Sequence, residues 1–175
     1  MKEKLLIVEL NEFNVELLNQ GVEELGLKNI QKILNLNHSK TLSDAKTERH
    51  GLDPWVQWVT VHTGQNSSQH KVIRIGEVPN LKFPQIWEKL GENGITTGIW
   101  GAMNASRNNT KGCKFFLPDP WTFSEAGYPK LLNFYLNLPR IYSKNYVKPS
   151  KIKLANGFFK MLIFLLSSRI FLKMI

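Results

Sequence analysis

The chain has 175 residues, 42% of them apolar, which is enough for one domain with a hydrophobic core and argues against disorder. Its formal charge of +9, from 23 Lys and Arg against 14 Asp and Glu, favours anionic partners such as phosphate esters, nucleic acid or acidic lipid, although a solvated basic surface explains the charge equally well. The single cysteine, Cys113, excludes an intrachain disulfide and a cysteine-based zinc cluster.

The first predicted element is a strand at residues 4–10, KLLIVEL, which is a continuous apolar run bounded by charge. Such a run is typical of a strand that is buried on both faces of a sheet. The apolar part of residues 1–8 is too short for a signal peptide, so we expect a cytoplasmic protein.

A helical region follows, with Asn11 or Asn14 as its expected cap. Apolar residues recur at roughly helical spacing over residues 15–35, and two glycines, Gly21 and Gly26, are expected to divide this stretch into two short helices. Residues 39–45, SKTLSDA, are compatible with a short strand.

Residues 53–64, DPWVQWVTVHTG, crowd two tryptophans, a glutamine, two threonines and a histidine into a segment that ends in glycine. We expect a helix here, because Pro54 suits the first turn of a helix. The segment KVIRIGEVP, residues 71–79, is short, β-branched and ends at a turn, which indicates a strand.

The best-defined unit is KFPQIWEKLGENGITTGIWG, residues 82–101. Pro84 suits a helix N-terminus, Gly94 suits the C-terminal cap, and the last seven residues indicate a buried strand. Strand, helix and strand in this order imply a right-handed crossover and a parallel sheet. The sequence therefore predicts an α/β fold with a mostly parallel sheet flanked by helices.

Residues 126–175 are predicted to form a basic, apolar helical extension that follows an α/β domain over residues 1–125. CKFFLP, at 113–118, indicates a further strand before this boundary. The uninterrupted apolar run within 157–175 is too short to cross a bilayer. This tail either lies on a membrane surface or forms a core helix whose covering partner is missing, and we favour the second interpretation. The basic residues of the extension include Lys130, Arg140, Lys144, Lys148, Lys151 and Lys153.

Taken together, the order of these parts resembles the N-terminal portion of the alkaline phosphatase superfamily, especially its phosphodiesterase, nucleotide pyrophosphatase and sulfatase branches. The parts are the strand that ends in a polar residue, the helix that ends in Thr63-Gly64, a following His70, and the Pro84-led helix that feeds the strand GIWG. The resemblance covers residues 4 to about 125. It is strongest to an uncharacterised alkaline-phosphatase-like group whose motif reads much like PWVQWVTVHTG.

The resemblance implies a divalent metal, zinc, manganese or magnesium, bound where the first strand ends. The matching position here is Asn11, and Glu9 lies two residues earlier on the same side of the strand. An amide oxygen is neutral and a weaker ligand than the carboxylate usual in the family. Asn11 is equally well explained as a helix cap.

The family also carries a nucleophile at a helix N-terminus, about ten residues before the Thr-Gly glycine. The matching position is Pro54, flanked by Asp53 and Trp55, and none of the three is an alcohol or thiol. Asp53 is a candidate N-cap, metal ligand or catalytic base, with capping favoured. Thr60 is a weaker candidate nucleophile, and packing inside the helix is its more frequent role.

Three further residues of this motif are candidates for substrate binding. Gln57 can hydrogen-bond a phosphate or a sugar, Trp55 can form a wall against a ring, and His62 is either a site residue or a core histidine. A solvated amide and core packing are the competing interpretations for Gln57 and Trp55.

The second half of the chain lacks the remaining metal ligands that the family implies. All four histidines precede residue 71, and Asp119 is the only aspartate after Asp53. We therefore expect the N-terminal fragment of a metal-dependent phosphate or sulfate ester hydrolase that acts on a small anionic ester, is inactive alone and does not retain its metal. The alternatives are a non-catalytic anion-binding module of the same fold and a basic membrane-surface protein; no specific nucleic-acid binding is expected.

Overall fold

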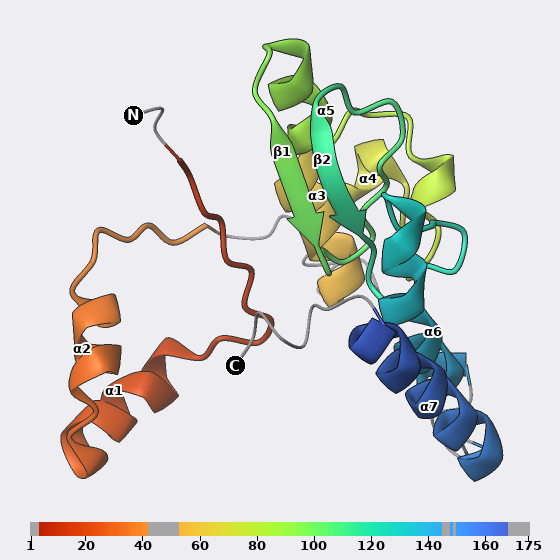
Figure 1. Ribbon diagram of the computed structural model, residues 1–175. Coiled ribbons are helices and arrows are strands. Elements are labelled where there is room, and N and C mark those ends of the chain that lie inside the picture. Colours follow the sequence, from red (N-terminus) through yellow and green to blue (C-terminus); the bar gives the residue numbers. More distant parts are fainter. Residues whose placement is uncertain (1–3, 42–52, 145–147, 149, 168–175) are drawn as a thin grey trace. The chain divides into compact units, whose positions relative to one another are not determined.

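The computed structural model describes residues 4–41, 53–144, 148 and 150–167, and the chain divides into two compact units, residues 1–46 and 47–175 (Figure 1). The domain boundary predicted at residue 125 falls inside the second unit.

The first unit contains two helices, α1 (Val15–Leu25) and α2 (Lys28–Leu34), which pack against each other. The Asn14 side chain caps α1 by accepting hydrogen bonds from the N–H groups of Glu16 and Leu17, at 2.9 and 3.0 Å. Gly26 ends the helix in the left-handed region at a φ of 63°. The predicted pair of short helices is confirmed, with the division at Gly26 and with Gly21 inside α1.

Residues 4–10 form no strand, which differs from the buried strand predicted for them. Leu5 and Leu6 are 84% and 83% exposed. A strand requires a hydrogen-bonded neighbour, and the described residues of the first unit contain no other strand to supply one. The described part of the strand expected at 39–45, residues 39–41, is likewise not a strand, while residues 42–45 lie outside the described residues.

The second unit contains two strands and five α-helices among its described residues. In chain order they are α3 (Pro54–Thr63), α4 (Ser67–His70), α5 (Ile86–Glu92), β1 (Thr97–Trp100), β2 (Cys113–Leu117), α6 (Asn133–Lys144) and α7 (Lys151–Ser167). Short 3₁₀ turns lie at Val78–Asn80 and Lys130–Leu132.

The two strands pair in parallel, so the class predicted from the sequence is confirmed as mixed α/β with a parallel sheet. Helix α5 precedes β1, and a capping box between Gln85 and Glu88 starts it immediately after Pro84. Residues 71–77 form no strand, because their backbone groups are bonded by side chains instead: Asn104 binds Arg74 O and Gly76 N.

The hydrophobic core lies between α5, the strands and the loop that follows β1. Its buried members are Trp87, Ile99, Ala105 and Phe116. The Trp87 indole N–H donates to the carbonyl of Ser106 at 2.8 Å, so the largest core residue also fixes that loop.

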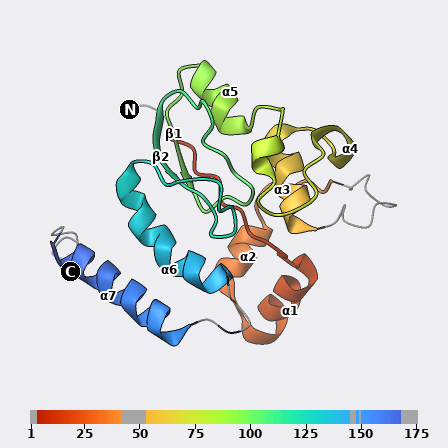
Figure 2. The same cartoon turned by 90° about the vertical axis from the view of Figure 1, so that its right-hand side faces the viewer.

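Helices α6 and α7 form an antiparallel hairpin (Figures 1 and 2). The rings of Phe134 and Phe164 stack at 4.6 Å between centroids, near the start of α6 and the end of α7. In the described part of the chain, no helix is both long enough and apolar enough to cross a membrane. Helix α7 thus has a covering partner along one face, which the sequence did not indicate.

Candidate functional site

The carboxyl ends of β1 and β2 meet at one edge of the sheet because the strands are parallel. Asn104 follows β1, Asp119 follows β2, and the Asn104 N–H donates to Asp119 Oδ2 at 3.1 Å. We call Asn104, Asp119 and the residues bonded to their side chains the carboxyl edge. In open α/β sheets, ligands bind outside this end of the strands.

Asn104 holds the start of α3 at the carboxyl edge. Its buried side-chain amide donates to the carbonyls of Trp55 and Arg74, at 3.0 and 3.1 Å, and accepts from the Gly76 N–H at 2.7 Å. Asn104 also adopts a φ of 50°, which asparagine tolerates better than most residues. The sequence motif 53–64 therefore begins beside the ends of both strands.

Asp119 is 2% exposed, and its two carboxylate oxygens accept four hydrogen bonds. One oxygen accepts from the N–H groups of Trp121 and Thr122, at 2.9 and 3.0 Å. The other accepts from the Asn104 N–H and the Thr122 hydroxyl. The four hydrogen bonds compensate the cost of burying the charged carboxylate. A metal ion could bind Asp119 only by displacing some of these donors.

Arg140 connects α6 to the same region. One guanidinium nitrogen, Nη2, donates to the carbonyls of Thr122 and Glu125, at 2.7 and 2.6 Å. Burial lowers the pKa of Arg140 from its usual value, while the negative charges of Asp119 and Glu125 oppose this shift. Arg140 is therefore part of the packing of α6, whereas the sequence indicates only one more cation in a basic stretch.

The start of α3 offers few donors to an incoming anion. Asp53 occupies the N-cap position of α3, as the sequence predicted, with an extended backbone (φ −63°, ψ 134°). Pro54 has no N–H, and the N–H groups of Val56 and Gln57 both donate to the carbonyl of Asp53. The start of α3 therefore offers fewer free backbone N–H groups to an oxyanion than the family resemblance implies.

Thr60 is tied into the interior by its neighbours. Its hydroxyl lies 3.1 Å from His70 Nε2 and 3.4 Å from the Val56 carbonyl. The Val72 N–H donates to His70 Nδ1, so in the neutral ring Nε2 carries the proton and donates to Thr60. His70 therefore cannot remove the Thr60 proton, and the contacts support the packing interpretation of Thr60.

The remaining residues of the motif mostly build the core. His62 is 3% exposed and lies against Trp58 and Trp87, with ring centroids 6.1 and 4.9 Å away, so it is a core histidine. The Trp55 indole N–H donates to the carbonyl of Ile73 at 3.1 Å, and Trp55 is half-buried. Gln57 is also half-buried.

The predicted metal ligands, Glu9 and Asn11, belong to the first unit. Asn11 is exposed and Glu9 is partly exposed. Within the described ranges, no three His, Cys, Asp or Glu side chains are grouped closely enough to hold a metal ion. The described residues of the carboxyl edge do not fit a divalent metal, and the metal remains a prediction from the resemblance.

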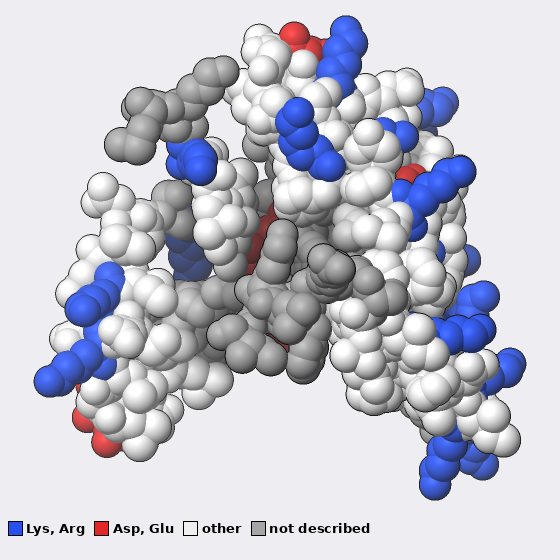
Figure 3. Space-filling model, viewed as in Figure 1, with Lys and Arg blue, Asp and Glu red and all other residues white. Residues whose placement is uncertain are grey.

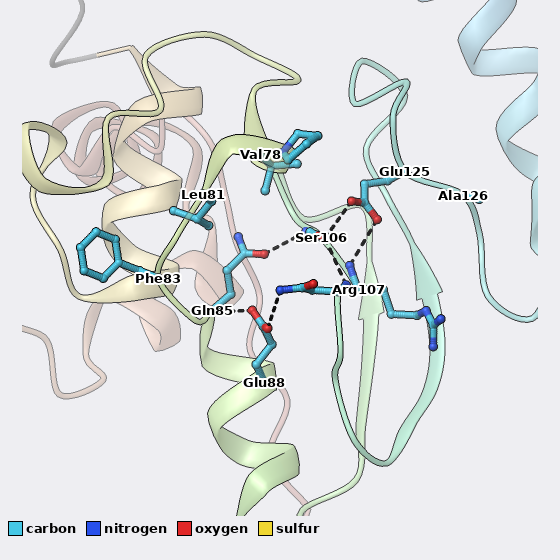
Figure 4. Close-up of a pocket in the computed structure, with 11 residues that line it drawn as sticks. Val78, Leu81, Phe83, Gln85, Glu88, Ser106, Arg107, Glu125 and Ala126 are labelled. Carbon is cyan, nitrogen blue, oxygen red and sulfur yellow. Dashed lines mark hydrogen bonds between the residues drawn. The ribbon is translucent and has the colours of Figure 1, made fainter.

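A cavity of about 460 Å³ lies between α5 and the loop that follows β1 (Figure 4). Its lining combines apolar and polar side chains, which include Val78, Leu81 and Phe83 together with Glu88, Ser106 and Glu125. The carboxylates already accept hydrogen bonds: Glu88 from the Gln85 N–H and Asn108 amide, Glu125 from the Ser106 hydroxyl. The guanidinium of Arg107 turns away from Glu88 and lies 4.4 Å from the centre of the Tyr128 ring.

Both Asn104 and the cavity were missed from the sequence. One local signal was the PDPWT turn around Asp119, in which an aspartate precedes a threonine by three residues. The other was the capping pair of Gln85 and Glu88 beside the cavity. No family model matches the chain, and comparison with curated proteins and with solved structures gives no match either.

Proposed function

We propose that the chain is the N-terminal part of a metal-dependent hydrolase of phosphate or sulfate esters, and that the carboxyl edge faces the ester. One observation supports this proposal most directly. Asn104 joins the ends of the parallel strands to the start of α3, through its bonds to Asp119 and Trp55. In α/β enzymes this edge is the usual ligand site, and the resemblance puts the attacking group of the family at the start of this helix.

In this proposal Asp53 is the ionisable group of the site and acts as base or metal ligand. Gln57, which lies about one helical turn after Asp53, hydrogen-bonds the ester. A bound divalent metal would polarise the ester and lower the pKa of a water molecule. The described residues do not form a metal set, so we derive no catalytic step from them. Glu9 and Asn11 are the positions at which the family resemblance implies metal ligands.

Hydrolysis of chromogenic esters tests the proposal. The substrates are bis-p-nitrophenyl phosphate, p-nitrophenyl phosphate and p-nitrophenyl sulfate, each with added zinc, manganese or magnesium. The chain alone and the chain joined to the coding sequence that follows it in frame are assayed side by side. We expect no turnover by the chain alone and metal-dependent turnover by the longer product.

The variant Asp53→Asn, made in the longer product, tests the assigned site. We expect it to lower kcat at least about a hundredfold, the usual contribution of a general base. Glu92→Gln, an exposed acidic residue at the end of α5, is the matched control and should leave kcat unchanged. A longer product without ester hydrolysis, or an Asp53→Asn variant with full activity, would refute the proposal.

A further inference from the structure

The net positive charge of the protein comes from its C-terminal part. All 14 acidic residues precede residue 126, and nine of the 23 Lys and Arg residues follow residue 125, so the formal +9 resides entirely in residues 126–175. Lysine and arginine side chains, and no acidic ones, lie over α6 and α7 on the face shown in Figure 3. This part of the surface attracts anions.

One face of α7 is covered by α6. Leu154, Gly157, Met161 and Phe164 recur at helical spacing and are all partly buried. A Cβ atom at Gly157 would lie 3.2 Å from side-chain carbons of both Leu138 and Ile141, so the two helices approach closely there. The first apolar face of α7 is thus accounted for by the hairpin.

A second apolar face of α7 is exposed. Phe159, Leu162 and Leu166 follow one another at intervals of three and four residues and are 60%, 38% and 57% exposed. Phe158 and Ile163 widen this face and are also exposed. We call these five residues the outer face of α7.

Lysines border the outer face of α7. Lys153 and Lys160 are seven residues apart, which puts them on the same side of the helix, and both are exposed. The 17-residue helix carries no acidic residue. A wide apolar face bordered by lysines is typical of a helix that lies in the plane of a membrane interface.

We propose that the outer face of α7 binds the surface of an anionic phospholipid bilayer, with α7 parallel to the membrane plane. The apolar side chains would enter the boundary between headgroups and acyl chains, while Lys153 and Lys160 contact lipid phosphates. A second copy of the chain fits this face less well, because residues 126–175 contain no acidic side chain to pair with these lysines. This inference goes beyond the proposed hydrolase and does not depend on it.

Vesicle flotation of the 175-residue chain tests the proposal. We expect the protein to float with vesicles of phosphatidylcholine containing about 30% phosphatidylserine and to stay behind with pure phosphatidylcholine. Lys153→Gln with Lys160→Gln should lower the partition coefficient about thirtyfold, because each lysine near an anionic surface contributes roughly 1 kcal/mol. Lys28→Gln with Lys32→Gln, on exposed positions of α2, is the matched control and should leave binding unchanged.

A second pair of variants separates insertion from simple charge attraction. Phe159→Ser with Leu166→Ser should weaken binding at least about tenfold. The control is Val61→Ser with Ile95→Ser, at exposed apolar positions elsewhere in the same unit. It should leave vesicle binding unchanged. Circular dichroism and thermal unfolding establish that each variant is folded.

Three outcomes would overturn the proposal. The first is equal flotation with neutral and anionic vesicles. The second is binding that responds to the lysine variants but not to the apolar ones, which would indicate a general affinity for polyanions, including nucleic acid. The third is sedimentation of the free protein as a dimer that Phe159→Ser with Leu166→Ser converts to a monomer, together with no flotation.

Discussion

The Asn104 side chain uses both amide N–H bonds and its oxygen inside the protein, and its partners lie between 28 and 49 residues away in the sequence. Truncation to alanine would leave the Trp55 and Arg74 carbonyls and the Gly76 N–H without these bonds. Because each unsatisfied buried group costs about 1–3 kcal/mol, we expect Asn104→Ala to lower the free energy of unfolding by at least about 3 kcal/mol, measured by urea denaturation.

Asn108→Ala is the matched control for this prediction. Asn108 has a φ of 40°, close to the 50° of Asn104, but its side chain is exposed. Alanine there incurs similar backbone strain and removes one exposed hydrogen bond, to Glu88, without opening a buried network, so we expect a loss of only about 1 kcal/mol. Equal effects at the two positions would show that backbone strain, and not the hydrogen bonds, explains the importance of Asn104.

Cys113 is partly buried at the start of β2, and its thiol donates to the carbonyl of Phe115 at 3.3 Å. Burial raises the pKa of the Cys113 thiol, and the nearby charge of Arg107 only partly offsets this shift. A raised pKa keeps the proton on sulfur to higher pH, and the thiolate is the reactive form. Alkylation by iodoacetamide should therefore reach half its maximal rate at higher pH in the folded protein than in urea. A midpoint at the same or lower pH would contradict this.

At this scale the sequence identifies residues whose partners are local. Asn14 was one of two predicted caps and is confirmed, because the N–H groups that it binds lie two and three residues away. Asn104 and Asp119 were not recognised as a pair, because no pattern in the sequence shows that residues 15 positions apart end two adjacent strands. His62 carried two interpretations, and only the position of Trp87 decides between them.

Helix α5 lies very close to the loop before β2. A Cβ atom at Gly91 would lie 2.3 Å from the backbone carbonyl oxygen of Lys111, which cannot move without shifting the loop. Alanine usually stabilises a helix interior by about 1 kcal/mol relative to glycine. We expect Gly91→Ala to do the opposite and to lower the free energy of unfolding by about 2 kcal/mol.

Gly157→Ala in α7 is the control, since its Cβ would meet only the side-chain ends of Leu138 and Ile141, at 3.2 Å, and no backbone atom. This substitution should be neutral or slightly stabilising. Thermal or urea unfolding of both variants measures the difference, and a stabilising effect of Gly91→Ala would show that the loop yields easily.

Among the elements, helices were predicted better than strands, for a physical reason. The helices α1, α3 and α5 were recognisable because caps, prolines and apolar spacing are local signals. The strands expected at 4–10 and 71–79 are not formed, since a strand depends on a partner elsewhere in the chain, and Asn104 binds the backbone of the second segment. The strands β1 and β2 were predicted correctly, but the parallel pairing was expected between the segments 71–79 and 95–101, on either side of α5, and it forms between β1 and β2 instead.

The second unit contains every buried core residue among the described parts of the chain, and the helices of the first unit bury none. We therefore expect residues 47–175 to fold without residues 1–46, with a Tm within about 3 °C of the full chain, because surface deletions change stability little. Differential scanning calorimetry of both proteins measures this. Loss of cooperative unfolding on deletion would show that the first unit completes the core.

At the scale of the whole molecule, we propose that this chain carries the ester-facing layer of a metallohydrolase, while its described residues form no group of ligands that could hold a metal ion. Calorimetric titration with zinc, followed by metal analysis of the desalted protein, tests this most directly. We expect no tight zinc site in the 175-residue chain. Stoichiometric retention of two zinc ions by this chain alone, with ester hydrolysis that depends on them, would contradict it.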